Sequence, residues 1–478
     1  MASQEPQFFI KARGAGRLVV DESPKFDLEA YIANYRGRTR FERLLVIGLT
    51  STQLCLEALK AAITEAKQGE DAQRYETAWS MLQDVAPQDP DALFDVAWVE
   101  RTNKQVKAET DKKELELKGY KNNLIKESIR MGYDDLGQHY HAVGDLTKSN
   151  KAYATMRDYC TTNQHIVIMN MNLIKVSIDQ GSWFAVQNHV QRIRGSAGAH
   201  KYPEAEKNSA KLSAAHALAS LAQSNYRDAA EEFLATDPRM STAKLDDPAD
   251  EEKYNEILTP NDVAVYGGLC ALASMTREEL QAKVLDNNDF RNYLELEPHI
   301  RRAISHFVSA KYSQCLSILD SYRADYLLDI YLKPHLLRLY SDIRSKAIQQ
   351  YFIPFSTVTL AALSEAFNTD ERTIEHELIQ LIKNKDLDAR IDLIDRVLVA
   401  RQVDPRRQML ADALEAAKEH ERTLHLRMLR MAILNAGLEV RSPKDKGSQG
   451  AGGNINGSGD LIIGESQSRI GTRGGSVW

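Results

Sequence analysis

The period with which apolar and polar residues alternate changes near residue 387, and the stretch around it predicts a distinct module. Apolar side chains recur at helical spacing over Phe355–Phe367 and again over Glu371–Asn384. From residue 387 to 392 apolar and charged residues alternate, and Arg396–Arg401 is rich in Val and Leu, so two strands are predicted there. The turn at residues 393–395 joins them. Two helices followed by such a hairpin predict a winged helix.

The charge of the second predicted helix argues against DNA as the partner of this module. Residues 370–388 contain six acidic and three basic side chains. A helix that enters a major groove lies among phosphates and needs basic side chains around it. We therefore expect the winged helix to pack against protein, and a DNA-binding regulator is the weaker alternative.

Upstream of the winged helix the pattern is helical from Phe26 onward. From residue 132, helices pair around tight turns that begin at Gly144, Gly181, Ser224 and Ala310. The first three turns lie 37 and 43 residues apart, close to the period of tetratricopeptide (TPR) hairpins. Because one hairpin cannot bury its apolar face alone, the hairpins are expected to stack into a mostly α-helical, TPR-like solenoid.

Downstream of the winged helix a single long helix is predicted over Asp404–Asn435, with Gly437 as its stop. Its apolar residues follow a heptad-like seam that Glu421 interrupts. Such a seam predicts packing against partner helices, and the alternative is that the helix folds back onto its own chain. The seam consists of Leu410, Leu414, Ala417, Leu424, Met428 and Met431.

These patterns divide the chain into six predicted parts. They are a flexible N-terminus (1–22), an N-terminal helical arm (23–131), TPR-like repeats (132–330, with the helical part that leads into the winged helix from about 261), a winged helix (331–403), a C-terminal bundle helix (404–437) and a glycine-rich disordered tail (438–478).

Composition narrows the function classes further. The net charge of −6 gives no general attraction to nucleic acid or to an anionic membrane. No apolar run reaches the roughly 18 residues of a membrane span, and the N-terminus lacks the pattern of a secretory signal. The four cysteines lie far apart without metal-binding spacing, so reduced, buried thiols are expected.

The sequence contains no recognisable set of catalytic residues. Neither a phosphate-binding glycine loop nor a GxSxG or HExxH motif occurs. His139 and His141 come nearest to a metal site, since metalloproteases of the JAMM type follow His-x-His with a serine and then an aspartate. Ser149 fits that pattern, but Ala152 stands at the aspartate position. We predict no catalytic, metal-binding or cofactor-binding residues, and a metallohydrolase is the last alternative.

A helical-repeat array followed by a winged helix resembles the PCI-domain family, whose members occur in the proteasome lid, the COP9 signalosome and eukaryotic initiation factor three. Within it, the chain most closely resembles subunit 1 of the signalosome, and the tail VRSPKDKGSQG (440–450) fits as well. The equivalent subunit of the proteasome lid has the same architecture and is the alternative. The resemblance is carried by FDLEAYIANYRGRTRFERLL (26–45), YGGLCALASMTREEL (266–280), LELEPHI (294–300), LLDIYLKPHLLRLYSDIRSKAIQQYFIPF (327–355) and ARQVDPRR (400–407).

The resemblance implies a non-catalytic scaffold in a complex that removes a ubiquitin-like modifier from cullins and so regulates cullin–RING ubiquitin ligases. It implies other PCI subunits, a separate catalytic metalloprotease subunit and cullin–RING ligases as partners, and a location in nucleus and cytoplasm. By the same analogy the strand Arg396–Val399 would offer a free backbone edge to a neighbouring subunit. The predicted interface residues are therefore Arg396, Val397, Leu398 and Val399, together with the six seam residues of the terminal helix.

Overall fold

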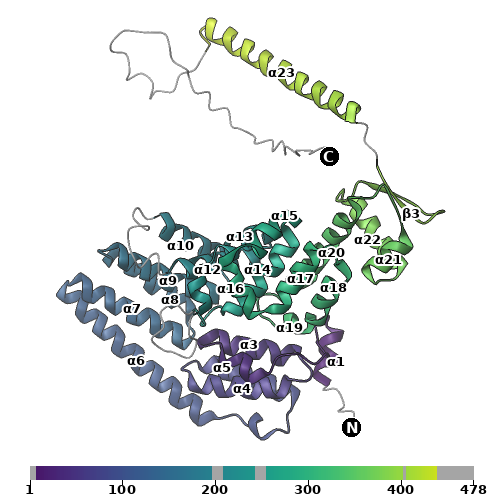
Figure 1. The fold of residues 1–478 in the computed structure, drawn as a ribbon. Coiled ribbons are helices and arrows are strands. Elements are labelled where there is room, and N and C mark those ends of the chain that lie inside the picture. The colour runs from purple at the N-terminus through teal and green to yellow at the C-terminus, as the bar shows by residue number, and fades with distance from the viewer. Residues whose placement is uncertain (1–6, 196–207, 243–253, 402–404, 439–478) are drawn as a thin grey trace. The chain divides into compact units, whose positions relative to one another are not determined.

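The computed structural model describes residues 7–195, 208–242, 254–401 and 405–438. They divide into two units, one that ends at residue 401 and one that begins at residue 405 (Figure 1). The predicted class is confirmed, because the chain is mostly α-helical with one small sheet. The finer boundaries proposed inside the first unit stay predictions. The proposed disordered tail lies, from residue 439 on, outside the described residues.

The N-terminal helices begin earlier than the sequence predicts. Residues 7–14 form helix α1, and Phe9 within it is fully buried in the main core. Val20 then bridges to Ser51. The prediction that residues 1–22 are flexible is therefore wrong for residues 7–22, since Phe9 anchors them. The elements are α1 (Gln7–Gly14), α2 (Leu28–Ala33), α3 (Gly37–Thr50), α4 (Cys55–Gln68), α5 (Ala72–Val85) and η1 (Pro90–Ala92).

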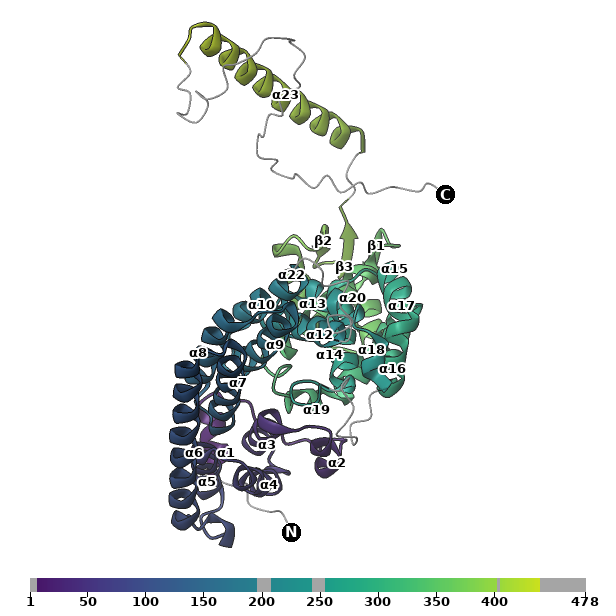
Figure 2. The ribbon, with the colours of Figure 1, turned by 90° about the vertical axis from the view of Figure 1, so that its left-hand side faces the viewer.

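The predicted repeat turns are confirmed, and their geometry explains why these residues begin them. Gly144, Gly181, Ser224 and Ala310 all have positive φ, between 59° and 97°, which reverses the chain directly after a helix. From α7 to α13 each helix packs on the next, and Figure 2 shows the succession. The elements are α6 (Val96–Asn123), α7 (Lys126–Val143), α8 (Leu146–Met156), η2 (Arg157–Tyr159), α9 (Asn163–Asp179), α10 (Trp183–Gly195), α12 (Ser209–Ala222), α13 (Tyr226–Leu234) and η4 (Pro238–Thr242).

Two apolar cores hold this unit together. The main core runs from Phe9 to Leu398, and a smaller one is built by α6, α7, α8 and α9 around Tyr153 and Met156. Helix α6 joins both, because Trp98 near its start lies in the main core and Leu117 near its end lies in the smaller one. Helix α9 also has residues in both, Ile174 in the main core and Leu173 in the smaller one, so α6 and α9 form the junction of the two cores.

Helix α14 is the most deeply buried element of the second half. Gly268 on it lets α17 approach closely, since a Cβ at that position would lie 2.3 Å from Ile300 Cγ2. Cys270 on α14 and Cys315 on α18 are buried free thiols, as is Cys55, while Cys160 is half-buried. The elements are α14 (Pro260–Ser274), α15 (Arg277–Glu279), η5 (Leu280–Leu285), α16 (Asn288–Leu296), α17 (Pro298–Val308), α18 (Tyr312–Ser321), α19 (Arg323–Leu327) and α20 (Leu336–Phe352).

The winged helix forms as predicted, with one strand that the sequence pattern missed. Residues expected to begin a helix at Phe355 instead form strand β1. The sheet order is β1-β3-β2, and both pairings are antiparallel. The elements are β1 (Thr357–Thr359), α21 (Leu360–Phe367), α22 (Glu371–Lys383), β2 (Ala389–Asp392) and β3 (Val397–Ala400). The second unit contains the predicted terminal helix, α23 (Pro405–Asn435).

Candidate interaction surfaces

Arg43 on α3 ties the N-terminal helices to the second half of the first unit, and it does so in complete burial. Its guanidinium donates to Asp329 Oδ2 at 2.5 Å and to Asp262 Oδ2 at 3.1 Å. It also donates to the Tyr31 hydroxyl and stacks at 4.0 Å over the ring of Tyr35. In Figures 1 and 2 the N-terminal helices accordingly lie against α19. This cluster positions helices from both halves of the unit.

The charges in this cluster depend on one another. Burial raises the pKa of Asp262, although Arg43 opposes that rise. Burial alone would lower the pKa of Arg43, but the neighbouring carboxylates and phenols, Asp262 first, raise it well above the ordinary value. The guanidinium therefore stays charged, and removing it would leave two carboxylates facing each other without a cation.

The same cluster explains part of the resemblance noted in the sequence. Tyr31, Tyr35 and Arg43 belong to the segment 26–45, while Tyr266 opens YGGLCAL and Asp329 lies in LLDIYL. The Tyr266 hydroxyl donates to Asp329 at 2.8 Å, and the Tyr35 hydroxyl donates to Asp262 at 2.7 Å. Segments far apart in the chain thus share one buried polar network.

The predicted edge strand lies in the middle of its sheet. β3 pairs with β1 on one side, where Val358 faces Leu398, and with β2 on the other, where Ile391 faces Leu398. Leu398 is fully buried, and Val397 and Val399 are half-buried. The prediction that Arg396–Val399 offers a free backbone edge is therefore wrong, because β1 already occupies that edge. Whether these four residues line a subunit interface stays a prediction.

The outer edges of the sheet belong to β1 and β2 instead. Both edge strands are short, with three and four residues. Next to β2 the wing presents Leu393 and Ile394, which are 66% and 93% exposed, and Asp392 Oδ1 accepts from the Ile394 amide to shape the turn. The sequence pattern predicts only a turn for these wing residues, although two adjacent apolar residues in a turn are a signal of contact with another surface.

The acidic side chains of α22 hold the winged helix together. Arg344 Nε on α20 donates to both carboxylate oxygens of Glu377 at 2.8 Å. Arg396, at the start of β3, donates to Glu371 at 2.8 Å. These bonds pair two of the acidic residues of α22. The remaining acidic residues give the start of this helix no basic surface, which a phosphate backbone requires.

Helix α23 has exposed apolar side chains along its whole length. All six predicted seam residues, Leu410, Leu414, Ala417, Leu424, Met428 and Met431, are exposed. The structure adds a second apolar face in the C-terminal half, formed by Leu426, Leu429 and Ile433, which are between 46% and 56% exposed. At 100° per residue this second set lies on roughly the opposite side from Leu424 and Met428. A helix that is apolar on two sides is typical of the interior of a bundle.

The two histidines of the His-x-His pair contact different elements. His139 Nε2 contacts Thr110 Oγ1 on α6 at 2.8 Å, whereas His141 Nε2 contacts Asp179 on α9 at 2.6 Å. Ser149 donates to the Gly137 carbonyl. The two rings therefore have different partners and do not converge with Ser149 on one point.

The chain is similar to known proteins over most of its length. The family model described as "26S proteasome subunit RPN7" matches residues 95–283, and the PCI domain model matches residues 319–402. A relative in Emericella nidulans, named COP9 signalosome complex subunit 1, is 53% identical, with 90% of this chain and 86% of that protein covered. The Arabidopsis thaliana protein of the same name is 39% identical, with 90% and 94% covered.

Similarity to the proteasome lid is weaker and shorter. A 26S proteasome non-ATPase regulatory subunit 6 from Oryza sativa is 25% identical and matches 39% of this chain and 45% of that protein.

The helices formed by the described residues include none with the length and apolarity needed to cross a membrane.

Proposed function

The chain belongs to the family of COP9 signalosome complex subunit 1, and we propose that it is a non-catalytic scaffold of that complex. In this proposal it supports the removal of a ubiquitin-like modifier from cullins by a separate metalloprotease subunit. It would thereby regulate cullin–RING ligases, and we place it in both nucleus and cytoplasm. The observation that carries the scaffold role is α23, on which every described side chain is exposed, including apolar ones on two faces.

Helix α23 supports assembly as its role for an energetic reason. Exposed leucine and methionine side chains each gain roughly 1.5–3 kcal/mol when they are fully buried. Eleven large apolar residues between Met409 and Leu438 are at least 44% exposed. Partner helices that cover both of its apolar faces would complete a bundle of the kind that several subunits can build together.

The winged helix supports a second contact with neighbouring subunits. The outer edges of β1 and β2 and the exposed wing residues Leu393 and Ile394 could pair with an adjacent winged helix. The alternatives have less support. The proteasome relative is less similar than the signalosome relatives, and α22 begins with acidic residues, which disfavours DNA.

Affinity purification from cells tests the proposal. The full chain is expected to co-purify with other signalosome subunits, and a variant that lacks residues 404–435 is expected to lose them. A variant that lacks residues 439–478 is the control for shortening the C-terminus. Normal co-purification of the first deletion would contradict the bundle role. Cleavage of modified cullin by the purified chain alone would contradict the non-catalytic role.

A further inference from the structure

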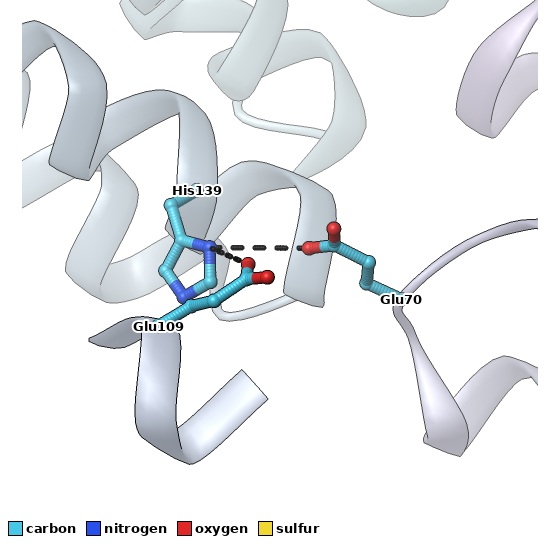
Figure 3. Close-up of side chains that lie close together, drawn as sticks. All are labelled: Glu70, Glu109 and His139. Atoms are coloured by element: carbon cyan, nitrogen blue, oxygen red, sulfur yellow. Dashed lines mark ion pairs between the residues drawn. The ribbon is translucent and has the colours of Figure 1, made fainter. Parts of the chain in front are cut away.

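Three side chains from separate segments meet beside the junction of the two apolar cores (Figure 3). Glu70 lies in the turn between α4 and α5, Glu109 on α6 and His139 on α7. His139 is 5% exposed. Its Nδ1 atom faces one carboxylate oxygen of each glutamate, both at 3.9 Å, and the three atoms lie within 4.8 Å of one another.

The opposite side of the imidazole ring shows which nitrogen carries the proton. The Thr110 hydroxyl donates its only hydrogen to the Val106 carbonyl at 2.7 Å. Its oxygen can therefore only accept from His139 Nε2, which is 2.8 Å away. In the neutral ring the proton then lies on Nε2, and Nδ1 keeps a lone pair that points at the two carboxylates.

Nδ1 of His139 and one carboxylate oxygen each of Glu70 and Glu109 thus converge. Each of the three atoms offers an electron pair, and none of them carries a hydrogen to share. A separation of 3.9 Å is too long for a hydrogen bond, and among the described residues Nδ1 has no hydrogen-bond partner. Ligands about 2.1 Å from one cation lie roughly 3.0–4.2 Å apart. The two 3.9 Å distances fall within that range, and the two carboxylate oxygens, which lie no more than 4.8 Å apart, need at most a small rotation of the partly exposed glutamates.

We propose that Glu70, Glu109 and His139 bind a divalent zinc ion. Imidazole nitrogen with carboxylate oxygens is a ligand set that zinc accepts, whereas magnesium and calcium prefer oxygen ligands alone. Thr110 serves as a positioning residue, because its hydrogen bond to Nε2 fixes the tautomer that presents Nδ1 to the metal. Water completes the coordination on the exposed side of the glutamates.

The location gives the ion a structural role. Glu70 follows α4, which packs in the main core, while His139 lies on α7, whose apolar residues build the smaller core. The neighbouring contacts across this junction are polar, such as the bond from Arg38 on α3 to the His141 carbonyl at 3.0 Å. Zinc would join the turn after α4 to the α6–α7 hairpin, in addition to the apolar contact that Trp98 on α6 makes in the main core.

Calorimetric titration of the purified full-length chain with zinc chloride tests the site. Cys160 is replaced by serine in every variant, since a half-buried thiol is a competing ligand. We expect one zinc ion per chain, a rise in melting temperature with zinc, and at least about tenfold weaker binding in Glu70→Gln and in Glu109→Gln. Glu116→Gln, an exposed position two turns along α6, is the matched control and should bind as the parent does.

Several results would overturn the proposal. Equal zinc binding by the parent and both glutamine variants would place the metal elsewhere. Equal competition by magnesium at the same concentration would exclude the assignment to zinc. If Glu109→Gln destabilises the chain while the parent binds no zinc, a protonated imidazole pairs with the carboxylates instead. Because both glutamates are partly exposed and glutamine has the same shape, circular dichroism is expected to show an unchanged fold in all variants.

Discussion

Apolar residues make up 9 of the 15 residues of α14 and 15 of the 31 residues of α23, but the two helices use them in opposite ways. On α14, Val263, Leu269, Cys270 and Leu272 are all fully buried by neighbouring helices of the first unit. On α23 every described side chain is exposed. The first helix therefore derives its stability from its own chain, whereas the second has apolar surface that only another helix can remove from water. The predictions below test that difference, in decreasing order of the effect on the stability of the isolated chain.

The largest effect is expected for Arg43→Met. The substitution leaves Asp262 and Asp329 buried without their cation, which should lower the free energy of unfolding by about 3–5 kcal/mol in urea denaturation. Arg40→Met on the same helix is the matched control. Its pair with Glu65 is partly exposed, so the loss should be below about 1 kcal/mol. Similar losses in both variants would mean that the buried network is not what joins the two halves of the first unit.

The close contact between α14 and α17 predicts a smaller loss. Gly268→Ala places a Cβ 2.3 Å from Ile300 Cγ2, so one of the helices must shift, at about 1–3 kcal/mol. Gly119→Ala on α6 is the control with the opposite sign. A Cβ there meets nothing within 4 Å, and helix propensity should stabilise the chain by about 0.5–1 kcal/mol. A stabilising Gly268→Ala would show that α14 is less tightly packed than its burial indicates.

The sequence predicted the features that depend on near neighbours. The turns at Gly144, Gly181, Ser224 and Ala310 were found because a chain reversal needs only a few adjacent residues, and α22 and α23 were found from their own periodicity. The same local reasoning established the winged-helix hairpin. Local patterns therefore predicted most of the helices and the fold class.

Features that join distant segments could not be predicted in this way. Strand β1 has only three residues, and it exists because β3, about 40 residues later, supplies its hydrogen bonds. Arg43 and Asp329 are 286 residues apart. The glutamates that face His139 follow no spacing motif, because three different segments supply the ligands. Each of these features becomes visible only after the chain has folded.

A half-buried lysine in the first unit should make stability depend on pH. Burial lowers the pKa of Lys346 on α20 to about 8, and its ammonium donates to the Leu272 carbonyl at 3.0 Å. In the unfolded chain the pKa is about 10.4, so between these values the unfolded state binds more protons and stability rises with pH. Lys346→Met should remove about 1 kcal/mol of this rise between pH 8 and 10, after allowing for residual exposure.

The urea midpoints of the parent and of the variant are measured at several pH values between 8 and 10, and the difference between them is followed across that range. Tyrosines and thiols that titrate at high pH are common to both proteins and cancel in this difference. Lys418→Met on α23 is the matched control, because its side chain is exposed and should show no such dependence. A control variant that behaves like Lys346→Met would mean that α20 and α23 do not differ in the burial of their lysine side chains.

The smallest effect on the isolated chain, and the most informative for function, is expected on α23. Replacing Leu424 and Met428 by glutamine should change the melting temperature of the purified chain very little, since both are exposed. The same change should weaken co-purification with other signalosome subunits strongly. Replacing Leu426 and Leu429 tests the second face, and Glu419→Gln is the control. Loss through both faces would place α23 inside a bundle, and loss through one would place it at the edge. If either pair instead lowers the melting temperature of the chain alone, α23 folds back onto its own unit, and the contrast with α14 disappears.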